Sequence, residues 1–278
     1  MKRWLFAAGG AALLGVLSVR PYNARKSELR NLFKKKYIAH RGLFRNPDIP
    51  ENSMAAFKNA VKHGYAIELD VQLAGDGALI VFHDDDLMRM CSDPRRVRDM
   101  DLNELQNFTL GDTSERIPLF KDVLDMVKGR VPLMVEVKPG GDYINAVKET
   151  TRLLSEYKGK YCIESFHPFV LYWLKRHYPE ILRGQLSTDF KKDGDKHNAL
   201  IQLGLTNMIC NFLSRPDFIS YNHKYSHNFS FQICARLFRS SNAAWTIKNR
   251  KQLRKAEKEF EFFIFDGFLP EKKQYNNS

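Results

Sequence analysis

The stretch that decides the fold is Tyr65–His83, YAIELDVQLAGDGALIVFH. In its first half apolar residues occupy the odd positions, whereas Glu68 and Asp70 occupy even positions. Successive side chains of a β-strand point to opposite faces, so this alternation predicts a strand with two carboxylates side by side on one face. The turn sequence at 74–77, Ala-Gly-Asp-Gly, then predicts a hairpin that returns through 78–83 and ends on an imidazole.

Two further apolar runs end in charged or titratable side chains. The run at 131–138, VPLMVEVK, again separates apolar from charged positions, and the run at 36–40 ends in a histidine that an arginine follows. Buried charges are costly for stability, so their concentration at strand ends indicates a functional site, and neighbouring carboxylates there favour a divalent metal ion. The candidate residues are Glu68, Asp70, Glu136, His40, His83, Arg41 and Lys138.

After residue 36, short apolar runs alternate with amphipathic segments through most of the 278-residue chain. We expect strands near 36–40, 65–73, 78–83, 131–137, 160–165, 182–187, 217–221, 243–247 and 261–265. We expect helices near 52–63, 101–107, 119–128, 142–157, 168–177, 195–214, 230–239 and 249–259. Two of the strands form the hairpin. The other eight, separated by single helices, predict an α/β fold, a closed (β/α)₈ barrel of the TIM type.

The barrel is expected to span 36–270, with a polar tail at 271–278. The charged stretch 84–116 follows the hairpin and predicts a small insertion at the barrel mouth. Residues 1–35 predict a hydrophobic anchor and a basic linker.

The anchor is the run Trp4–Val19, which holds 16 residues without a charge. As a helix it spans ~24 Å, less than the ~30 Å hydrocarbon core of a bilayer unless flanking residues snorkel. No small-x-small cleavage site follows the run, which favours an uncleaved anchor over an export signal or an interfacial helix. Two Lys and Arg precede the run and seven follow it before residue 37, which predicts a cytoplasmic catalytic domain.

The net charge of +12 is concentrated near the N-terminus. Residues 1–36 contain nine Lys and Arg and one acidic residue. Basic residues that flank an apolar run are typical of a membrane-proximal segment and not of a groove for nucleic-acid phosphates. We therefore expect a membrane as a partner and no nucleic acid.

The motifs of this chain resemble those of the glycerophosphodiester phosphodiesterase family. The resemblance covers about 36–270 and is most specific in the first half of that range. The matching stretches are His40-Arg41-Gly42, Pro50-Glu51-Asn52-Ser53, Ile67-Glu68-Leu69-Asp70-Val71, Asp76-Gly77, His83-Asp84, Ile117-Pro118-Leu119 and Val135-Glu136-Val137-Lys138, with looser matches at Glu164-Ser165-Phe166, Trp245-Thr246 and Phe265-Asp266.

This resemblance implies a TIM-type barrel that hydrolyses glycerophosphodiesters to glycerol 3-phosphate and an alcohol. Residue by residue, it implies metal ligation by Glu68, Asp70 and Glu136, acid/base catalysis by His40 and His83, and phosphate contacts by Arg41 and Lys138. The implied cofactor is a divalent cation, Ca²⁺ or Mg²⁺, with Mn²⁺ also possible, and oxygen ligands suit these ions better than zinc. The chain departs from the family pattern at Ala74-Gly75 and Phe265-Asp266.

Other readings of the same residues remain open at this point. A lysophospholipase D or a phospholipase C-like phosphodiesterase would use similar histidines, carboxylates and metal. A catalytically idle, membrane-tethered phosphodiester sensor would need the cations but not two histidines. The sequence does not say which histidine is the base, or whether water or the substrate's own glycerol hydroxyl attacks.

Overall fold

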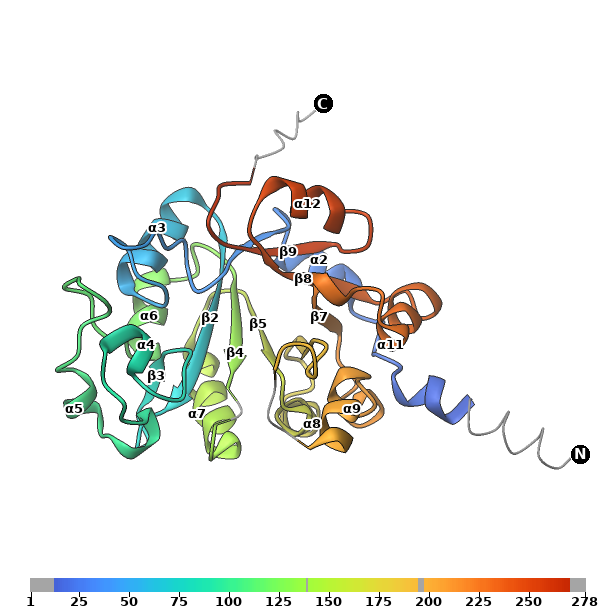
Figure 1. Ribbon diagram of the computed structural model, residues 1–278, viewed down its shortest axis with the longest axis horizontal. Coiled ribbons are helices and arrows are strands. Elements are labelled where there is room, and N and C mark those ends of the chain that lie inside the picture. Colours follow the sequence, from blue (N-terminus) through green and yellow to red (C-terminus); the bar gives the residue numbers. More distant parts are fainter. Residues whose placement is uncertain (1–12, 139, 195–197, 271–278) are drawn as a thin grey trace, which may run out of the picture.

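The computed structural model of the chain describes residues 13–138, 140–194 and 198–270, in which eight parallel strands form a closed barrel (Figure 1). β1 pairs with both β2 and β9, and this double pairing closes the barrel. The barrel strands are β1 (Tyr37–Ala39), β2 (Ala66–Leu73), β4 (Leu133–Val137), β5 (Tyr161–Ser165), β6 (Arg183–Ser187), β7 (Phe218–Asn222), β8 (Ser241–Ile247) and β9 (Phe262–Phe265). β3 (Leu79–Val81) runs antiparallel to β2. The predicted α/β barrel of the TIM type and the nine predicted strands are confirmed.

The main outer helices lie where the amphipathic segments predict them. They are α3 (Met54–His63), α6 (Phe120–Val127), α7 (Tyr143–Glu156), α8 (Pro168–His177), α9 (Ala199–Thr206), α10 (Asn211–Ser214), α11 (Phe229–Gln232) and α12 (Arg250–Ala256). In α3, the Ser53 side chain accepts a hydrogen bond from the backbone N–H of Ala56, and Gly64 ends the helix in a left-handed conformation.

Two predicted helices are interrupted. The predicted helix 195–214 is divided into α9 and α10, because Met208 adopts a φ of 52° and its side chain packs into the core. The predicted helix 230–239 begins as α11 and continues as a π-helical turn at Ile233–Leu237.

The alternation along the strands separates two cores. Odd-numbered residues such as Leu69 and Val135 belong to the large cluster that the outer helices cover. Even-numbered residues such as Met134 and Phe218 form a second cluster inside the barrel near its amino end. The same inward register continues toward the carboxyl end with acidic residues, so the barrel interior changes from apolar to charged along its axis.

The amino end of the barrel is closed by α2 (Lys26–Leu32), a helix inside the segment expected to be a basic linker. Its Leu29 and Leu32, together with Phe33, are buried in the interior cluster. The ring of Phe33 meets Phe262 edge to face, with 5.7 Å between centroids. The apolar residues are spaced three and four apart, which places them on one helix face, and this segment packs as part of the barrel core.

Shortening Leu29 to alanine is expected to lower the free energy of unfolding by about 2–5 kcal/mol, because it empties space in a closed core. The matched control is Asn31→Ala in the same helix, where the side chain is exposed and the expected change stays within about 0.5 kcal/mol. Urea denaturation followed by circular dichroism measures both. Equal stability of the two variants would show that α2 does not pack as described.

The predicted insertion is a packed unit with its own small core. It contains α4 (Met88–Cys91), α5 (Leu102–Leu105) and a 3₁₀ turn at Val97–Asp99. Its apolar cluster comprises Ala74, Ile80, Phe82, Leu87, Val97, Met100, Leu105, Leu110 and Ile117. The insertion is therefore held beside the mouth as a folded unit.

The predicted anchor falls largely outside the described residues, since 4–12 are not among them. Residues 13–18 form a helix in which Leu13, Leu14 and Leu17 are exposed. Across the parts of the chain that the structure describes, no helix combines the length and apolar character that crossing a bilayer requires.

Candidate active site

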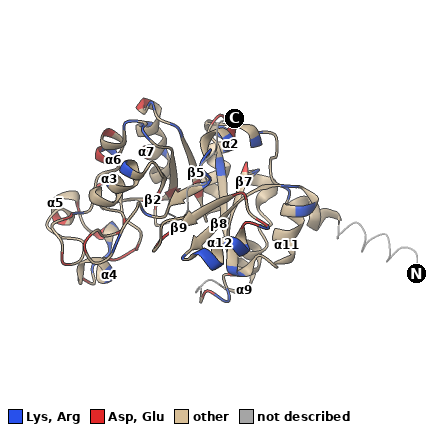
Figure 2. Ribbon diagram, turned by 90° about the horizontal axis from the view of Figure 1, so that it is seen from above, with Lys and Arg blue, Asp and Glu red and all other residues tan. Residues whose placement is uncertain are grey.

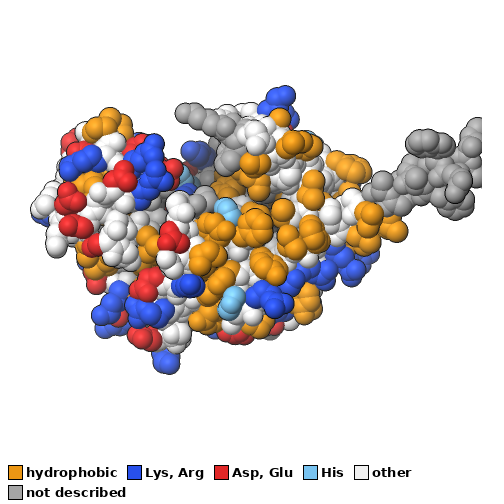
Figure 3. All heavy atoms as spheres, turned by 90° about the horizontal axis from the view of Figure 1, so that it is seen from below, with side chains coloured by type: hydrophobic (Ala, Val, Ile, Leu, Met, Phe, Trp, Pro, Cys, Tyr) orange, Lys and Arg blue, Asp and Glu red, His pale blue; other side chains and the backbone are white. Residues whose placement is uncertain are grey.

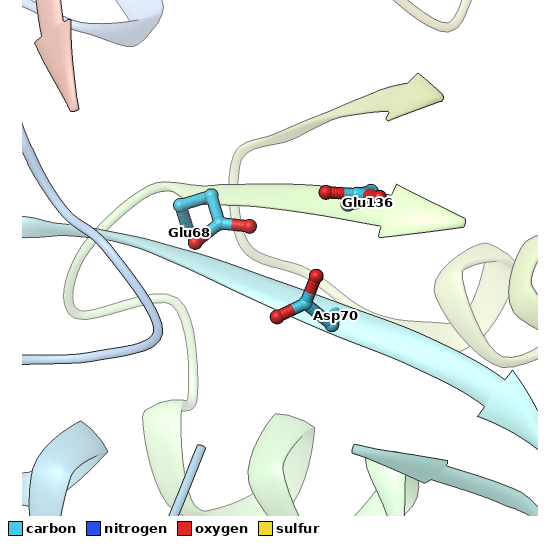
Figure 4. A group of neighbouring side chains, drawn as sticks. All are labelled: Glu68, Asp70 and Glu136. Atoms are coloured by element: carbon cyan, nitrogen blue, oxygen red, sulfur yellow. The ribbon is translucent and has the colours of Figure 1, made fainter. Parts of the chain in front are cut away.

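Three buried carboxylates converge inside the barrel (Figure 4). Glu68 and Asp70 project from β2, and Glu136 projects from β4. Asp70 and Glu136 are register partners on the two neighbouring strands. One oxygen from each carboxylate can be chosen so that the three lie within 4.8 Å of one another.

Two cations lie against these carboxylates. The ammonium of Lys138, just beyond β4, is 3.0 Å from Glu136 Oε1 and 3.6 Å from Asp70 Oδ1. The guanidinium of Arg41 is 3.5 Å from Asp70 Oδ2, and the backbone N–H of Arg41 donates to Glu68 Oε2 at 2.8 Å. Both cations are thus positioned by the acids that they partly neutralise.

The cations do not neutralise the cluster evenly. Burial raises the pKa of Glu68 well above its usual value, and the charges of Asp70 and Glu136 raise it further. Burial also raises the pKa of Glu136, against the opposing effect of Lys138. For Asp70, by contrast, Lys138, His83 and Arg41 outweigh burial and lower the pKa. The protein's own cations therefore support the ionised form of Asp70 but not fully those of Glu68 and Glu136.

The loop after β1 holds this cluster in place through hydrogen bonds. Asn52 is buried and donates from Nδ2 to Asp70 Oδ2 at 2.8 Å, and its backbone N–H donates to the carbonyl of Arg41 at 2.9 Å. Arg41 and Asn52 have φ values of 53° and 52°, a left-handed conformation that is uncommon for residues other than glycine. Such strain at two residues that contact the acids is typical of a functional site.

Each candidate histidine is bound to a carboxylate through Nδ1. His40 Nδ1 is 3.1 Å from Asp266 Oδ2, and His83 Nδ1 is 2.6 Å from Asp84 Oδ1. These contacts leave Nε2 of each ring for another partner. Burial lowers the pKa of His40, against the opposing effect of the Asp266 hydrogen bond.

Arg89 of α4 connects the insertion to this site. Its guanidinium donates to Asp84 Oδ2 at 2.7 Å and to Glu51 Oε1 at 2.6 Å. Glu51 also accepts from Arg41 at 2.5 Å. A continuous chain of hydrogen bonds therefore runs from His83 through the insertion to the arginine beside the carboxylates.

The structure adds partners whose roles the sequence did not reveal. These are Asp84, Asp266, Glu51, Asn52, Arg89 and Glu164. Glu164 of β5 is buried, and burial together with the charge of Glu136 raises its pKa well above the usual value. Its Oε2 has no hydrogen-bond partner among the residues described. Their position in the sequence could have indicated these residues, because most of them lie at the carboxyl end of a predicted strand or in the loop that follows.

A groove of about 890 Å³ begins beside Lys138. The hairpin after β2, the insertion and the start of α7 line it, with Arg96 and Arg98 among the lining residues. Of the predicted site residues only Lys138 lines this groove, whose volume is large enough for a small polar molecule.

Comparison with known proteins gives a consistent result. The model of the "Glycerophosphoryl diester phosphodiesterase family" matches residues 40–260. A glycerophosphodiester phosphodiesterase of Caldanaerobacter subterraneus subsp. tengcongensis is 34% identical over 164 residues, which are 55% of this chain and 67% of that protein. The human lysophospholipase D GDPD1 is 26% identical over 166 residues, 55% of this chain and 51% of that protein.

Among solved structures, an Oleispira antarctica phosphodiesterase in complex with the product sn-glycerol-3-phosphate has a similar fold. The TM-score is 0.67, the sequence identity is 22%, and the match covers 83% of this chain and 92% of the other. This likeness supports the barrel architecture.

Proposed function

Because the chain belongs to the glycerophosphoryl diester phosphodiesterase family, we propose that it hydrolyses glycerophosphodiesters to glycerol 3-phosphate and an alcohol. The observation that carries this proposal is the cluster of Glu68, Asp70 and Glu136 beside two cations. A phosphodiester needs charge neutralisation at phosphorus and proton transfer at both the attacking and the leaving oxygen, and this group of residues offers each of these functions.

A divalent cation fits the three carboxylates. Ligand oxygens lie about 2.3–2.6 Å from Ca²⁺, so two oxygens on one Ca²⁺ are at most about 5 Å apart, and the observed limit of 4.8 Å satisfies this condition. For Mg²⁺, at about 2.0–2.1 Å, the limit is about 4.2 Å, so the carboxylates would have to draw closer together to share this smaller ion. A bound cation would also stabilise the ionised forms of Glu68 and Glu136, which burial disfavours. When bound, such an ion supplies Lewis-acid polarisation of a phosphoryl oxygen. The ligand set is compatible with Ca²⁺, Mg²⁺ and Mn²⁺ alike.

The chain's own cations suit the substrate phosphate. Arg41 has planar donors that match phosphate oxygens, and its pairing with Glu51 holds the guanidinium in place. Lys138 keeps its charge because Glu136 and Asp70 raise its pKa despite burial. We assign to both the neutralisation of the phosphodiester.

We assign the base role to His40 and the acid role to His83. A base must be neutral before it acts, and burial lowers the pKa of His40. Its Nδ1–H donates to Asp266, which leaves the lone pair on Nε2 for the attacking hydroxyl, from water or from the substrate's glycerol moiety. The acid role then falls to His83, whose Nδ1 is 2.6 Å from Asp84 Oδ1, a contact that holds the ring and leaves Nε2 for the leaving oxygen.

An Asp266→Asn variant tests the base assignment. The charge and hydrogen bond of Asp266 raise the pKa of His40, so their loss lowers this pKa further. We expect the acidic limb of the kcat/KM profile to move to lower pH, and the maximum rate to fall by up to ~10⁴-fold, since the carboxylate also fixes the tautomer. The control is Asp122→Asn on the exposed face of α6. A slower enzyme with an unmoved acidic limb would contradict the assignment.

The function itself is tested with glycerophosphocholine, glycerophosphoethanolamine, glycerophosphoglycerol and lysophosphatidylcholine, each assayed with Ca²⁺, Mg²⁺ and Mn²⁺. We expect release of glycerol 3-phosphate from at least one soluble diester, with activity lost on chelation. Turnover of the lysophospholipid alone would favour lysophospholipase D activity, which is the name of a human relative. Tight phosphodiester binding without turnover would identify a sensor.

We further propose that the run Trp4–Val19 anchors the chain in a membrane, with the catalytic domain in the cytoplasm. The support is the uncharged apolar composition of the run and the excess of Lys and Arg that follows it. Alkaline extraction of membranes and protease protection of sealed vesicles test the attachment and the sidedness.

A further inference from the structure

One outer helix of the barrel presents an apolar surface that nothing in the described structure covers. The stretch Ala199–Ser214 contains no charged residue, and its first helix, α9, buries none of its side chains. Leu200 is 81% exposed and Leu203 is 57% exposed. An outer helix of a barrel normally buries an apolar stripe and shows charges to solvent, so an apolar helix left at the surface marks an interaction site.

The exposed apolar side chains continue beyond α9. Figure 3 shows the molecule from below, and hydrophobic side chains gather over the half of that view that lies toward the N-terminus. Phe229 of α11 is 77% exposed, and Leu237 is 63% exposed. The remaining members are Phe169, Tyr172, Ile201, Ile209 and Phe212. We call this set of side chains on α8, α9, α10 and α11 with its π-helical turn the apolar face.

The N-terminal segment leaves the barrel beside the apolar face (Figure 1). The carbonyl of Val19 accepts a hydrogen bond from Asn211 of α10 at 2.9 Å, and the N–H of Tyr22 donates to the carbonyl of Pro216 at 2.7 Å. The helix at 13–18, with three exposed leucines, lies just before these contacts and belongs to the apolar run Trp4–Val19. A partner that binds the apolar run Trp4–Val19 must therefore also come close to the apolar face.

Basic residues accompany the apolar face. Residues 166–239 contain ten Lys and Arg and five acidic residues, although α9 and α11 themselves carry none. Figure 2 shows basic positions along α12. A cavity of about 650 Å³ at its edge is lined by four cations and one carboxylate, with three further residues: Arg25, Lys175, Arg183, Arg215, Glu180, Tyr22, Pro179 and Phe212. Burial lowers the pKa of Lys175, and the nearby arginines lower it further, so an anion would stabilise its charge.

We propose that the apolar face docks onto a lipid bilayer that contains anionic headgroups. Exposed aliphatic and aromatic side chains enter the boundary between headgroups and acyl chains, and cations beside them attract anionic lipid. The tethered apolar run makes a bilayer the partner that both elements meet at once. Phe169, Leu200 and Phe229 lie within the first turns of helices that follow β5, β6 and β7, whereas the cationic cavity and the contact of Tyr22 lie near the starts of β6 and β7. The docked surface would therefore run along the side of the barrel.

The test compares full-length variants for sedimentation with vesicles of phosphatidylcholine, with and without an equal share of phosphatidylglycerol. In the face variant, Leu200→Asp, Leu203→Asp and Phe229→Asp are combined. A charge-matched control combines Asn103→Asp, Asn107→Asp and Ser114→Asp, exposed positions in the insertion. A third variant carries Leu13→Asp, Leu14→Asp and Leu17→Asp. Circular dichroism and gel filtration accompany each variant.

We expect wild type and control to bind phosphatidylglycerol vesicles alike and phosphatidylcholine vesicles more weakly. The face variant should bind at least ~10-fold more weakly, since three apolar side chains lose their burial. The same three positions changed to serine provide the test if the aspartate variant does not fold. Vesicle binding that is lost only in the N-terminal variant would overturn the proposal. So would a face variant that dissociates a wild-type dimer while still binding vesicles, because the partner would then be a second copy.

Discussion

Replacing His83 by alanine is expected to reduce hydrolysis of glycerophosphocholine by about 10²–10⁴-fold and to spare most of the activity on a diester that releases nitrophenolate. Choline leaves as a poor alkoxide that needs a proton from the acid, whereas nitrophenolate leaves without one. His40→Ala should reduce hydrolysis of both substrates by a similar factor, because attack needs the base whichever group leaves. Steady-state kinetics on the two substrates at one metal concentration measure the difference.

The control for this pair is His177→Ala, which removes an exposed imidazole of α8 and should leave both rates unchanged. The opposite pattern, in which His40→Ala recovers on the activated ester and His83→Ala does not, would reverse the assigned roles. Full activity of both variants on glycerophosphocholine, with the fold intact, would exclude histidine acid/base catalysis and favour the sensor.

Replacing Asp70 by asparagine is expected to weaken divalent-metal binding and to reduce turnover by at least ~10²-fold, since loss of even an outer partner of a ligand commonly costs 10–100-fold. Asp70 is the carboxylate that Arg41, Lys138 and Asn52 all contact, so its loss also releases the cations assigned to the phosphate. The change keeps the side-chain shape and removes the charge. Calorimetric titration with Ca²⁺, Mg²⁺ and Mn²⁺ gives the affinity independently of activity.

Asp122→Asn on α6 makes the same chemical change at an exposed position and should alter neither metal affinity nor rate. Metal affinity equal to that of wild type in Asp70→Asn would refute this carboxylate as a ligand. Slower turnover at metal concentrations that saturate both proteins would separate the loss of phosphate positioning from the loss of metal.

The barrel was predictable because its strands obey a simple rule. Alternation of apolar and charged positions in β2 and β4 identified both the strands and the side on which Glu68, Asp70 and Glu136 lie. Their convergence follows from parallel pairing of neighbouring strands in register. These are consequences of local pattern and of a fold with few possible connections.

The partner of His40 and the contacts of Arg89 could not be predicted in the same way. His40 and Asp266 are 226 residues apart and meet only because β1 and β9 pair to close the barrel. Arg89 reaches Asp84 and Glu51 only because the insertion folds on its own core. Such contacts form only when distant segments pack together in the folded chain, and no periodic pattern in the sequence predicts them.

The helix α2 was missed for a different reason. Its seven residues lie among basic residues, and the charge pattern led to a linker although the leucines already had helical spacing. Composition indicates which residues of a segment face solvent. The burial of Leu29 and Leu32 depends instead on the barrel core against which they pack.

The closure of the barrel by α2 also determines how molecules move through the enzyme. Leu29, Leu32 and Phe33 fill the amino end of the barrel. The active site inside the barrel is therefore open only at the carboxyl end. Substrate, alcohol and glycerol phosphate must then all use the same opening. Each product therefore occupies the route of the next substrate until it departs, and the elements around the mouth control both admission and release.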